Sequence, residues 1–347
     1  MLFRYLSFAS KIFAANRRQL SKPFKLTYVV TKECHSKCLN CDIWKVKPQH
    51  ELTLEEAKQV ARKNPYFSWI DFTGGEPTDR EDFVDLVDTF NRNQPKLLLI
   101  HFVTNGLKPK RIVEMTKELL GRGLPRLTVS VSIDGPPAVN DQLRGIPKDF
   151  ERATETLRLL RQLKGLDVYA GMTLYAANTE LVFATVSAIS EVVPGFTLED
   201  LHVNIPHISG HFYGNNDRVL TVTEQMTRAI NDLERVRKFR ISPLRIVEGI
   251  YRKKINNYLQ TKECPEDCAA LMSSVILSET GVIYPCLMWD EPLGNVRDTD
   301  YDILPHLRSG RARDLREKLL KKDCANCWTP CEAFPTILSN CLRINQR

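Results

Sequence analysis

The sequence predicts an α/β fold with a parallel sheet, followed by a small cysteine-rich module near the C-terminal end. Three observations lead to this prediction. Six short apolar segments alternate with helical segments between residues 24 and 205. The ten cysteines fall into two groups, three at 34–41 and seven at 264–341. At 347 residues the chain also exceeds the usual size of one domain, which favours a large domain with an appendage, or two domains.

The overall composition is that of an ordinary globular protein, with 43% hydrophobic and 26% charged residues. The net charge of +7 permits an anionic substrate or a membrane surface but requires neither. No DNA- or RNA-binding motif is present, so nucleic acid is not expected as a partner. Tightly spaced cysteines are more typical of metal binding than of a disulfide framework, and we expect a cytoplasmic metal-binding protein.

Residues 1–22 are expected to form an amphipathic N-terminal helix. Their apolar side chains recur at helical spacing, and basic residues such as Arg4 and Lys11 interrupt them. The segment is too charged to span a membrane, and Lys11 breaks the apolar stretch that a signal peptide needs. Two interpretations stay open: a helix packed on its own domain, or a basic, aromatic-rich helix that contacts a membrane surface.

The six apolar segments are predicted to be buried strands, at 24–30, 67–72, 97–103, 127–133, 166–174 and 201–205. Helices are predicted between them, at 53–64, 78–93, 109–121, 150–164 and 178–192. Capping boxes of Thr53 with Glu56, and of Thr78 with Glu81, mark the start of the first two helices. Strands that alternate with helices predict a parallel sheet, and six units leave two forms open, a partial barrel or an open doubly wound sheet.

The pattern changes after residue 207. A stretch with Gly and Asn at 210–216 precedes predicted helices at 222–240 and 244–260. The remainder is rich in Cys and Pro, as expected for a small module stapled by metal. We therefore divide the chain into four parts: an N-terminal helix at 1–22, a core domain at 23–215, a helical connection at 216–262 and a cysteine-rich domain at 263–347.

Cys34, Cys38 and Cys41 follow the first predicted strand with the spacing C-x3-C-x2-C. Thiolates at this density suit an iron–sulfur cluster or zinc. A structural zinc site needs four ligands, and this loop supplies three. A [4Fe–4S] cluster on three cysteines leaves one iron open for a cofactor or substrate, so the loop predicts such a cluster.

The second predicted strand ends in Gly74, Gly75, Glu76 and Pro77. Two glycines let a ligand approach the backbone closely, and Glu76 can accept a hydrogen bond from an ammonium group. The carboxyl ends of parallel strands meet at one edge of a sheet, where such folds assemble their sites. The cysteine loop and the GGEP segment therefore predict a single cofactor site.

These two segments resemble the radical S-adenosylmethionine (SAM) superfamily, whose cluster loop is C-x3-C-x2-C and whose second strand ends in a GGE-type motif. The resemblance covers about residues 24–205 and implies a partial (β/α)6, TIM-like barrel. It implies that SAM chelates the open iron of a [4Fe–4S] cluster. One electron then cleaves SAM to methionine and a 5′-deoxyadenosyl radical, which takes a hydrogen atom from the substrate. A flavodoxin- or ferredoxin-type protein would donate that electron.

The resemblance also implies roles for single residues. It places Gly74, Gly75, Glu76 and Pro77 at the methionine amine of SAM. Asn105 follows the third strand in a family-like segment, and Ser132 and Arg144 are expected at the ribose or carboxylate of SAM. Ser132 as a plain buried hydroxyl and Arg144 as a solvated charge stay open as alternatives. Asn40 stands where many members carry an aromatic residue, with Trp44 nearby.

The seven later cysteines lie at 264, 268, 286, 324, 327, 331 and 341. Gly281 is expected to turn a hairpin that presents Cys286, and this segment resembles the SPASM and twitch extensions of radical SAM enzymes. The resemblance implies at least one auxiliary [4Fe–4S] cluster that could accept an electron. Its candidate ligands are Cys268, Cys286, Cys324 and Cys327, with Cys331 competing for one place. A second cluster on Cys264, Cys331 and Cys341, and zinc in place of iron and sulfur, stay open.

The substrate is not identified by these residues, and a peptide, a lipid or a small biosynthetic intermediate all fit. His207, His211 and Tyr213 follow the sixth strand, where an acid or base would act, and Asp290 and Glu291 lie near Cys286. Each also fits a loop or surface residue. The competing class is a non-enzymatic iron–sulfur or zinc protein that transfers electrons or binds a partner. That class does not explain three cysteines at a strand end beside GGEP.

Overall fold

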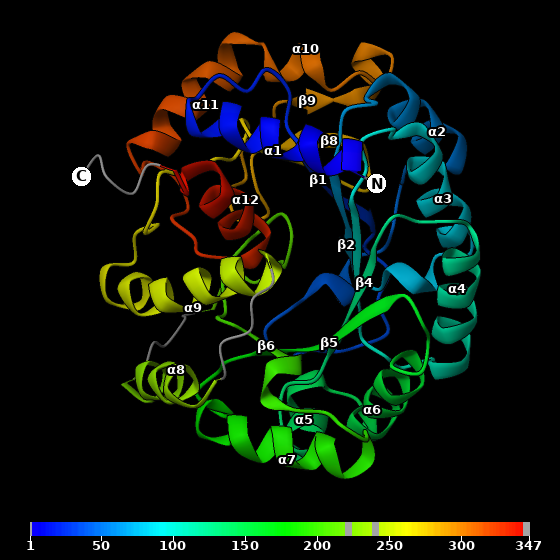
Figure 1. The fold of residues 1–347 in the computed structure, drawn as a ribbon, viewed down its shortest axis with the longest axis vertical. Coiled ribbons are helices and arrows are strands. Elements are labelled where there is room, and N and C mark those ends of the chain that lie inside the picture. Colours follow the sequence, from blue (N-terminus) through cyan, green and yellow to red (C-terminus); the bar gives the residue numbers. More distant parts are fainter. Residues whose placement is uncertain (1, 219–223, 238–242, 343–347) are drawn as a thin grey trace.

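The computed structural model describes residues 2–218, 224–237 and 243–342. Within them one sheet of nine strands has the order β6-β5-β4-β3-β2-β1-β7-β8-β9 (Figure 1). The strands are β1 (Lys25–Thr31), β2 (Trp69–Gly74), β3 (Leu99–Thr104), β4 (Leu127–Ser132), β5 (Leu166–Thr173), β6 (Leu201–Asn204), β7 (Ser274–Leu277), β8 (Val282–Tyr284) and β9 (Gly294–Asn295). The strands β1 to β6 are parallel neighbours in chain order, which confirms the predicted α/β core.

Helices connect the parallel strands, and Figure 1 shows α2, α3 and α4 along one side of the sheet with α5, α6 and α7 below them. The helices are α1 (Leu2–Asn16), α2 (Leu54–Lys63), α3 (Phe83–Asn93), α4 (Pro109–Gly121), α5 (Pro137–Arg144), α6 (Asp149–Leu160), α7 (Val182–Val192), α8 (Glu224–Val236), α9 (Pro243–Thr261), α10 (Leu304–Leu307), α11 (Gly310–Leu320) and α12 (Pro330–Asn340). The sequence patterns do not predict α5, whose last residue is Arg144.

The first predicted capping box is confirmed and the second is wrong. At the start of α2, the Thr53 hydroxyl accepts from the backbone N–H of Glu56 at 3.2 Å, and the Glu56 carboxylate accepts from that of Thr53 at 2.9 Å. Thr78 instead lies in a 3-10 turn, η2 (Pro77–Asp79), and α3 begins only at Phe83. The Thr78 hydroxyl donates to the buried carboxylate of Glu76 at 2.6 Å, which removes it from capping.

The cysteine-rich segment continues the sheet of the core. β7 pairs in parallel with β1 over four residues, from Lys25 with Ser274 to Tyr28 with Leu277. Gly281 turns the chain into the antiparallel strand β8 at a φ of +86°, so the predicted hairpin is confirmed. The sheet therefore crosses the boundary that we placed at 262/263, and the division into four parts stays a prediction.

The helix α1 packs on its own domain at the N-terminal ends of the strands. Phe8 stacks edge to face on Phe24, with 5.3 Å between ring centroids. The ammonium of Lys11 donates to the carbonyl of Tyr66 at 2.6 Å and to the hydroxyl of Ser68 at 2.8 Å, just before β2. Within the described ranges, no helix combines the length and apolar character that a membrane span requires.

Two apolar clusters organise the interior. The larger one fills the space between the sheet and its helices. The smaller one is built from Val29, Ile43, Phe212, Ile276, Cys286, Leu287 and Met288. Cysteines of both groups pack against this smaller cluster, Cys34 and Cys41 from the first group and Cys327 and Cys331 from the second. The fold therefore places the two cysteine groups on either side of one small apolar cluster.

Candidate active site

Three thiols of one loop open onto a single cavity. Cys34, Cys38 and Cys41 follow β1, and all three line a cavity of about 350 Å³. The same wall contains the predicted SAM-site residues Gly74, Gly75, Glu76, Asn105, Ser132 and Arg144. Pro77 is not part of this lining, because it begins η2 and is buried there.

Segments from three other parts of the chain fix the cysteine loop. The backbone N–H groups of Lys37 and Leu39 donate to the carbonyls of Arg144 and Leu143, at 3.1 and 2.9 Å. After β6, the carbonyl of Tyr213 accepts from the N–H of Asp42 at 2.7 Å. The third contact comes from the GGEP segment. Cys38 is thus held from both sides by backbone bonds, which pre-forms the loop without a bound group.

The two glycines of GGEP allow a close approach between backbones. A Cβ on Gly75 would lie 2.1 Å from the carbonyl oxygen of Glu33, and a Cβ on Gly74 would lie 2.2 Å from that of Thr31. The N–H of Gly75 donates to the Thr31 carbonyl at 2.8 Å. Both glycines line the cavity, so the prediction that they let a ligand approach stays open, and they also seat the end of β2 against the start of the cysteine loop.

Glu76 joins the ends of two strands. Its buried carboxylate accepts from the backbone N–H of Asn105 at 2.6 Å and from the hydroxyl of Thr78 at 2.6 Å. Burial raises the pKa of Glu76 above its ordinary value, although these donors oppose the shift. The carboxylate lies in the cavity wall, and it fixes the turn after β3 against GGEP.

Arg144 brings a positive charge to the cysteine loop. One guanidinium nitrogen lies 3.3 Å from a carboxylate oxygen of Asp134. Burial opposes the charge, but the thiol of Cys38 and the carboxylates of Asp134 and Asp149 keep the pKa of Arg144 above its ordinary range. Arg144 is therefore a mostly enclosed cation beside the thiols, at the end of α5 and with its side chain 13% exposed, which contradicts its interpretation as a solvated loop charge.

Several donors at the cavity have no partner among the described residues. They are the Nε of Arg144, the hydroxyl of Ser36 and the indole N–H of Trp44, all buried. Buried polar groups are almost always hydrogen-bonded, so unpartnered donors in a cavity wall point to an anionic or polar ligand. The residues present therefore fit SAM, whose carboxylate and ribose are acceptors, together with an anionic thiolate-bound cluster.

Burial works against ionisation of the three loop thiols. Burial raises the pKa of Cys34 to about 12 and that of Cys41 to about 11, and it raises the pKa of Cys38. A cation at the site is needed to deprotonate such thiols. Within the described residues, no three His, Cys, Asp or Glu side chains converge on a point suited to a single metal ion. A cluster is ligated at separate iron atoms, so its cysteines need not converge on one point.

Five of the later cysteines interact with one another around Cys327. Its thiol is hydrogen-bonded with that of Cys286, which raises the pKa of Cys286 and lowers that of Cys327. The thiols of Cys264, Cys268 and Cys324 are also close enough to Cys327 to interact with it electrostatically. Cys264 therefore belongs with the four predicted twitch ligands.

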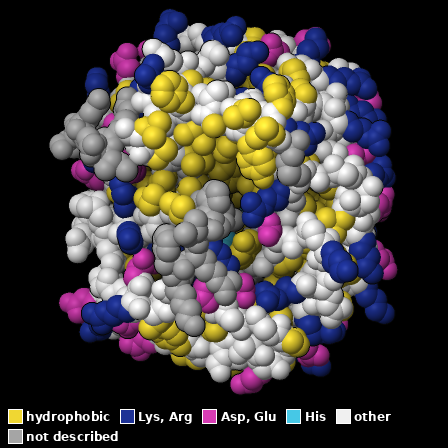
Figure 2. All heavy atoms as spheres, viewed as in Figure 1, with side chains coloured by type: hydrophobic (Ala, Val, Ile, Leu, Met, Phe, Trp, Pro, Cys, Tyr) yellow, Lys and Arg dark blue, Asp and Glu magenta, His cyan; other side chains and the backbone are white. Residues whose placement is uncertain are grey.

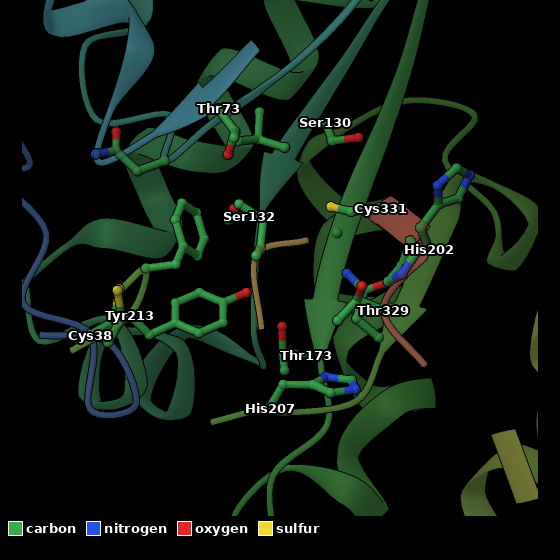
Figure 3. Close-up of a pocket in the computed structure, with 18 of the residues that line it drawn as sticks. Cys38, Thr73, Ser130, Ser132, Thr173, His202, His207, Tyr213, Thr329 and Cys331 are labelled. Carbon is green, nitrogen blue, oxygen red and sulfur yellow. The ribbon is translucent and has the colours of Figure 1, made fainter. Parts of the chain in front are cut away.

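Cys331 and Cys341 lie at the two ends of α12. Cys331 also interacts electrostatically with Cys327, but it lines the cavity, and Figure 3 shows its sulfur near Ser130. The Cys341 thiol donates to the carbonyl of Leu338 at 3.2 Å, close to α1. Ten residues of helix separate the two cysteines by about 15 Å. That distance is too long for one cluster, so the helix excludes a second cluster on Cys264, Cys331 and Cys341.

The inner face of the barrel is polar, although the strands are predicted to be apolar on both faces. The cavity-facing residues of β2 to β6 include Asp71, Thr73, His101, Thr128, Ser130, Ser132, Thr173, His202 and Asn204. Figure 3 shows Ser130, His202, Thr329 and Cys331 on one side of the cavity, and Cys38 and Tyr213 on the other. Polar residues at every second position, as in LTVSVS of β4, are the sequence signal for this wall.

The predicted acid–base candidates separate into two kinds. His207 and Tyr213 line the cavity, but His211, Asp290 and Glu291 do not. Both ring nitrogens of His207 are engaged, Nδ1 with the carbonyl of Ile205 at 2.9 Å and Nε2 with the N–H of Trp328 at 3.1 Å. His207 therefore connects the barrel to the cysteine-rich segment. Glu291 forms an ion pair with Arg311 at 2.6 Å.

Comparisons with known proteins agree with this geometry. Residues 28–180 match the radical SAM superfamily. The Fe-coproporphyrin III synthase of Methanosarcina barkeri is 27% identical over 92% of this chain and 84% of its own length. A mycofactocin maturase, MftC of Mycolicibacterium smegmatis, is 28% identical over 49% of this chain. The chain spans 43% of the length of that maturase. A probable GTP 3′,8-cyclase of Thermococcus kodakarensis is 29% identical over 40% of this chain, and the chain spans 47% of that protein.

Two solved structures share the fold. The structure of anSMEcpe with bound AdoMet aligns with a TM-score of 0.61 at 15% identity, over 93% of this chain and 98% of that one. Streptococcus suis SuiB bound to S-adenosylmethionine aligns with a TM-score of 0.60 at 14% identity, over 88% and 71%. At these identities the similarity shows the architecture alone.

Proposed function

Because this chain is a radical SAM enzyme, we propose that Cys34, Cys38 and Cys41 hold the [4Fe–4S] cluster at which SAM is cleaved. The observation that carries this assignment is one cavity that is lined by all three thiols, by Gly74, Gly75 and Glu76, and by the cation of Arg144. When bound, the reduced cluster and SAM supply a 5′-deoxyadenosyl radical that takes a hydrogen atom from the substrate. A flavodoxin- or ferredoxin-type protein is our proposed electron donor.

The protein's own residues bind and orient these groups. Glu76 and the carbonyls of Gly74 and Gly75 can accept from the amine of SAM, and Arg144 can donate to its carboxylate. The positive charge of Arg144 also stabilises thiolates on Cys34 and Cys38. Ser132 and Asn105 stand at the ends of β4 and β3 in the same wall, where we propose ribose contacts.

Anaerobic reconstitution with iron and sulfide tests the assignment. The reconstituted protein is reduced with dithionite, and 5′-deoxyadenosine is measured by mass spectrometry. We expect Cys38→Ala to abolish it and Cys341→Ala, a cysteine outside both proposed sites, to preserve it. Wild-type protein that binds iron but never cleaves SAM would return the chain to the class of non-enzymatic iron–sulfur proteins.

We propose one auxiliary cluster on the cysteines around Cys327, with Cys268, Cys286, Cys324 and Cys327 as its ligands and Cys264 as the alternative to Cys324. The interactions of Cys327 with the other thiols support this set, and the place of Cys331 in the cavity wall argues against including it. Two clusters give about eight irons per chain. We expect Cys286→Ala to bind about four irons, and Cys331→Ala to retain about eight.

The exposed part of α1 supports a further proposal about partners, a peripheral contact with an anionic membrane surface. Leu2, Phe3 and Leu6 are 74%, 67% and 61% exposed. Figure 2 shows apolar side chains gathered on this face, with Lys and Arg around them. Co-sedimentation with anionic and neutral vesicles tests it: Leu2→Ser/Leu6→Ser should reduce binding to anionic vesicles. Equal sedimentation of the two proteins contradicts the contact.

A further inference from the structure

Three side chains from neighbouring strands form a hydrogen-bonded row in the cavity wall. They are Asp71 on β2, His101 on β3 and Ser130 on β4, and all three line the cavity. Asp71 and His101 are direct cross-strand partners. The Nδ1 of His101 lies 3.3 Å from the Asp71 carboxylate, and its Nε2 lies 3.0 Å from the hydroxyl of Ser130.

The charge of Asp71 fixes the direction of the hydrogen bonds in this row. Its carboxylate accepts from the ammonium of Lys25 at 2.8 Å and from the indole N–H of Trp69 at 2.5 Å. Burial works against ionisation, but the Lys25 charge and the His101 contact hold the pKa of Asp71 well below its usual range. An ionised carboxylate only accepts, so His101 carries its proton on Nδ1. The Nε2 of His101 is then the acceptor for the Ser130 hydroxyl.

The row lies in the half of the cavity away from the cysteine loop. Ser130 precedes Ser132 by two residues and is therefore about 7 Å deeper in the barrel. Figure 3 places Ser130 with His202, Thr329 and Cys331, across the cavity from Cys38. The side chain of His101 is 23% exposed, whereas the side chain of Lys25 is fully buried. A group bound in the cavity can therefore reach His101.

Two further observations point to a ligand in this half. The hydroxyls of Thr128 and Tyr251 line the cavity, are buried, and have no partner among the described residues. Other charged or titratable groups lie around the row: Lys25 on β1, His202 on β6, Glu248 on α9, and Cys331 and Glu332 on α12. Glu248 is already paired with Arg237 and Arg252, at 2.9 and 2.7 Å. His101 can therefore exchange a proton with the cavity through the Ser130 hydroxyl, because its other ring nitrogen faces Asp71.

We propose that Asp71, His101 and Ser130 form a proton relay for a substrate that bears an O–H or N–H on the carbon that loses hydrogen. This inference rests on the proposed function. Loss of a hydrogen atom from that carbon leaves a substrate radical. The O–H or N–H proton then passes through Ser130 to Nε2 of His101, and one electron passes to an acceptor of the iron–sulfur class. A C=O or C=N double bond forms, so the substrate is oxidised by two electrons in total.

His101 and Ser130 are the catalytic residues of this relay, and Asp71 is its positioning residue. Ser130 touches the substrate proton, and His101 receives it. Asp71 acts through His101 by holding the Nδ1 tautomer, as an aspartate does behind a catalytic histidine in serine hydrolases. The row differs from a hydrolase site in its location, which is inside a radical SAM barrel rather than beside an oxyanion hole.

The relay can be tested without knowing the substrate. Diethyl pyrocarbonate acylates unprotonated imidazole nitrogens, and peptide mass spectrometry of the anaerobic holoenzyme reports the rate at His101 against pH. Ser130→Ala removes the hydrogen bond to Nε2 and should raise that rate several-fold. Thr173→Val is the matched control, because Thr173 lines the same cavity from β5, and no hydrogen bond among the described residues joins it to His101. It should leave the rate unchanged.

Two results would overturn the relay: a His101 that resists acylation at every pH, or equal rates in Ser130→Ala and Thr173→Val. The relay is supported if the acylation rate of His101 follows a single titration and changes only when Ser130 is replaced. A histidine that is inaccessible and purely structural would show neither behaviour. Formation of 5′-deoxyadenosine by the same wild-type preparation is measured in parallel. Failure of that reaction refutes the proposed function, while the acylation result still decides whether the relay exists.

Discussion

At the scale of single residues, the cofactor site depends on places where no side chain fits. Gly75 lies so close to the cysteine loop that a Cβ would come within 2.1 Å of the Glu33 carbonyl oxygen. That oxygen belongs to the backbone, so it cannot move without moving the loop that begins with Cys34. The end of β2 and the cysteine loop are therefore one structural unit, and Gly74 and Gly75 shape that loop.

Gly75→Ala should destabilise the protein by about 2–3 kcal/mol, because the added methyl overpacks a backbone contact. The displaced loop should also bind less iron after reconstitution. Gly121→Ala is the matched control, since that glycine ends α4 and an added Cβ there would meet no atom within 4 Å. It should leave stability within about 0.5 kcal/mol. Chemical denaturation and iron analysis of the two variants measure the difference, and equal behaviour would contradict the contact.

His207 is expected to make the free energy of unfolding depend on pH. Burial lowers the pKa of His207 to about 4, whereas an unfolded chain has the ordinary value of about 6.5. The unfolded state therefore binds more protons as the pH falls from 6.5 towards 4, and the folded state loses up to about 3 kcal/mol. Above pH 6.5 His207 is neutral in both states, so it no longer lowers the free energy of unfolding.

His207→Gln removes this titration while keeping an amide that can donate to Ile205 and accept from Trp328. Urea denaturation at pH 7 and pH 5 should show a loss for the wild type that exceeds the loss for the variant by about 2 kcal/mol. Parallel losses in the two proteins would mean that His207 is protonated in the folded state.

At the scale of elements, a buried ion pair connects two strands to the C-terminal helix. Lys25 on β1 is fully buried and pairs with Asp71 on β2 at 2.8 Å. Its ammonium also donates to the carbonyl of Cys331 in α12. We expect Lys25→Met to cost about 3–5 kcal/mol, because it leaves Asp71 buried without its cation. Lys25→Met/Asp71→Asn should recover much of this loss, as measured by denaturant unfolding of both variants. A double variant no more stable than Lys25→Met would contradict the pairing.

The strands and helices also show which features of the fold can be predicted from neighbouring residues in the sequence. All six parallel strands and the box at Thr53 follow from periodicity and capping, which act within a few residues. The box at Thr78 failed because Glu76, a buried carboxylate in need of donors, takes its hydroxyl. The pairing of β7 with β1 joins residues about 250 positions apart, and no local pattern encodes it. The cysteine loop was found from spacing, but His101 was missed because its strand was treated as apolar on both faces.

At the scale of the whole molecule, the sheet makes the barrel and the cysteine-rich segment interdependent. β7 covers the edge of β1 from Lys25 to Tyr28, α12 packs on α1 and α9, and Cys331 contributes to the cavity of the first cluster. Removing the segment would expose β1 as a long apolar edge, the kind of edge that promotes aggregation. It would also leave Lys25 without the Cys331 carbonyl. The segment is therefore part of the fold, whether or not its cysteines bind metal.

A protein truncated after Thr261 should consequently lose cooperative unfolding and aggregate, although it keeps all six parallel strands and the three loop cysteines. A protein ending at Leu342 is the matched control, since it keeps β7 and α12 and should unfold in one transition. Near-ultraviolet circular dichroism during heating measures both. Reconstitution with iron and sulfide separates the effect of metal from that of the sheet. If the missing strand β7 causes the loss of cooperative unfolding, adding iron and sulfide to the protein that ends at Thr261 will not restore it. A cooperative transition in the protein ending at Thr261 would show that the barrel folds alone and that the β1–β7 pairing contributes little.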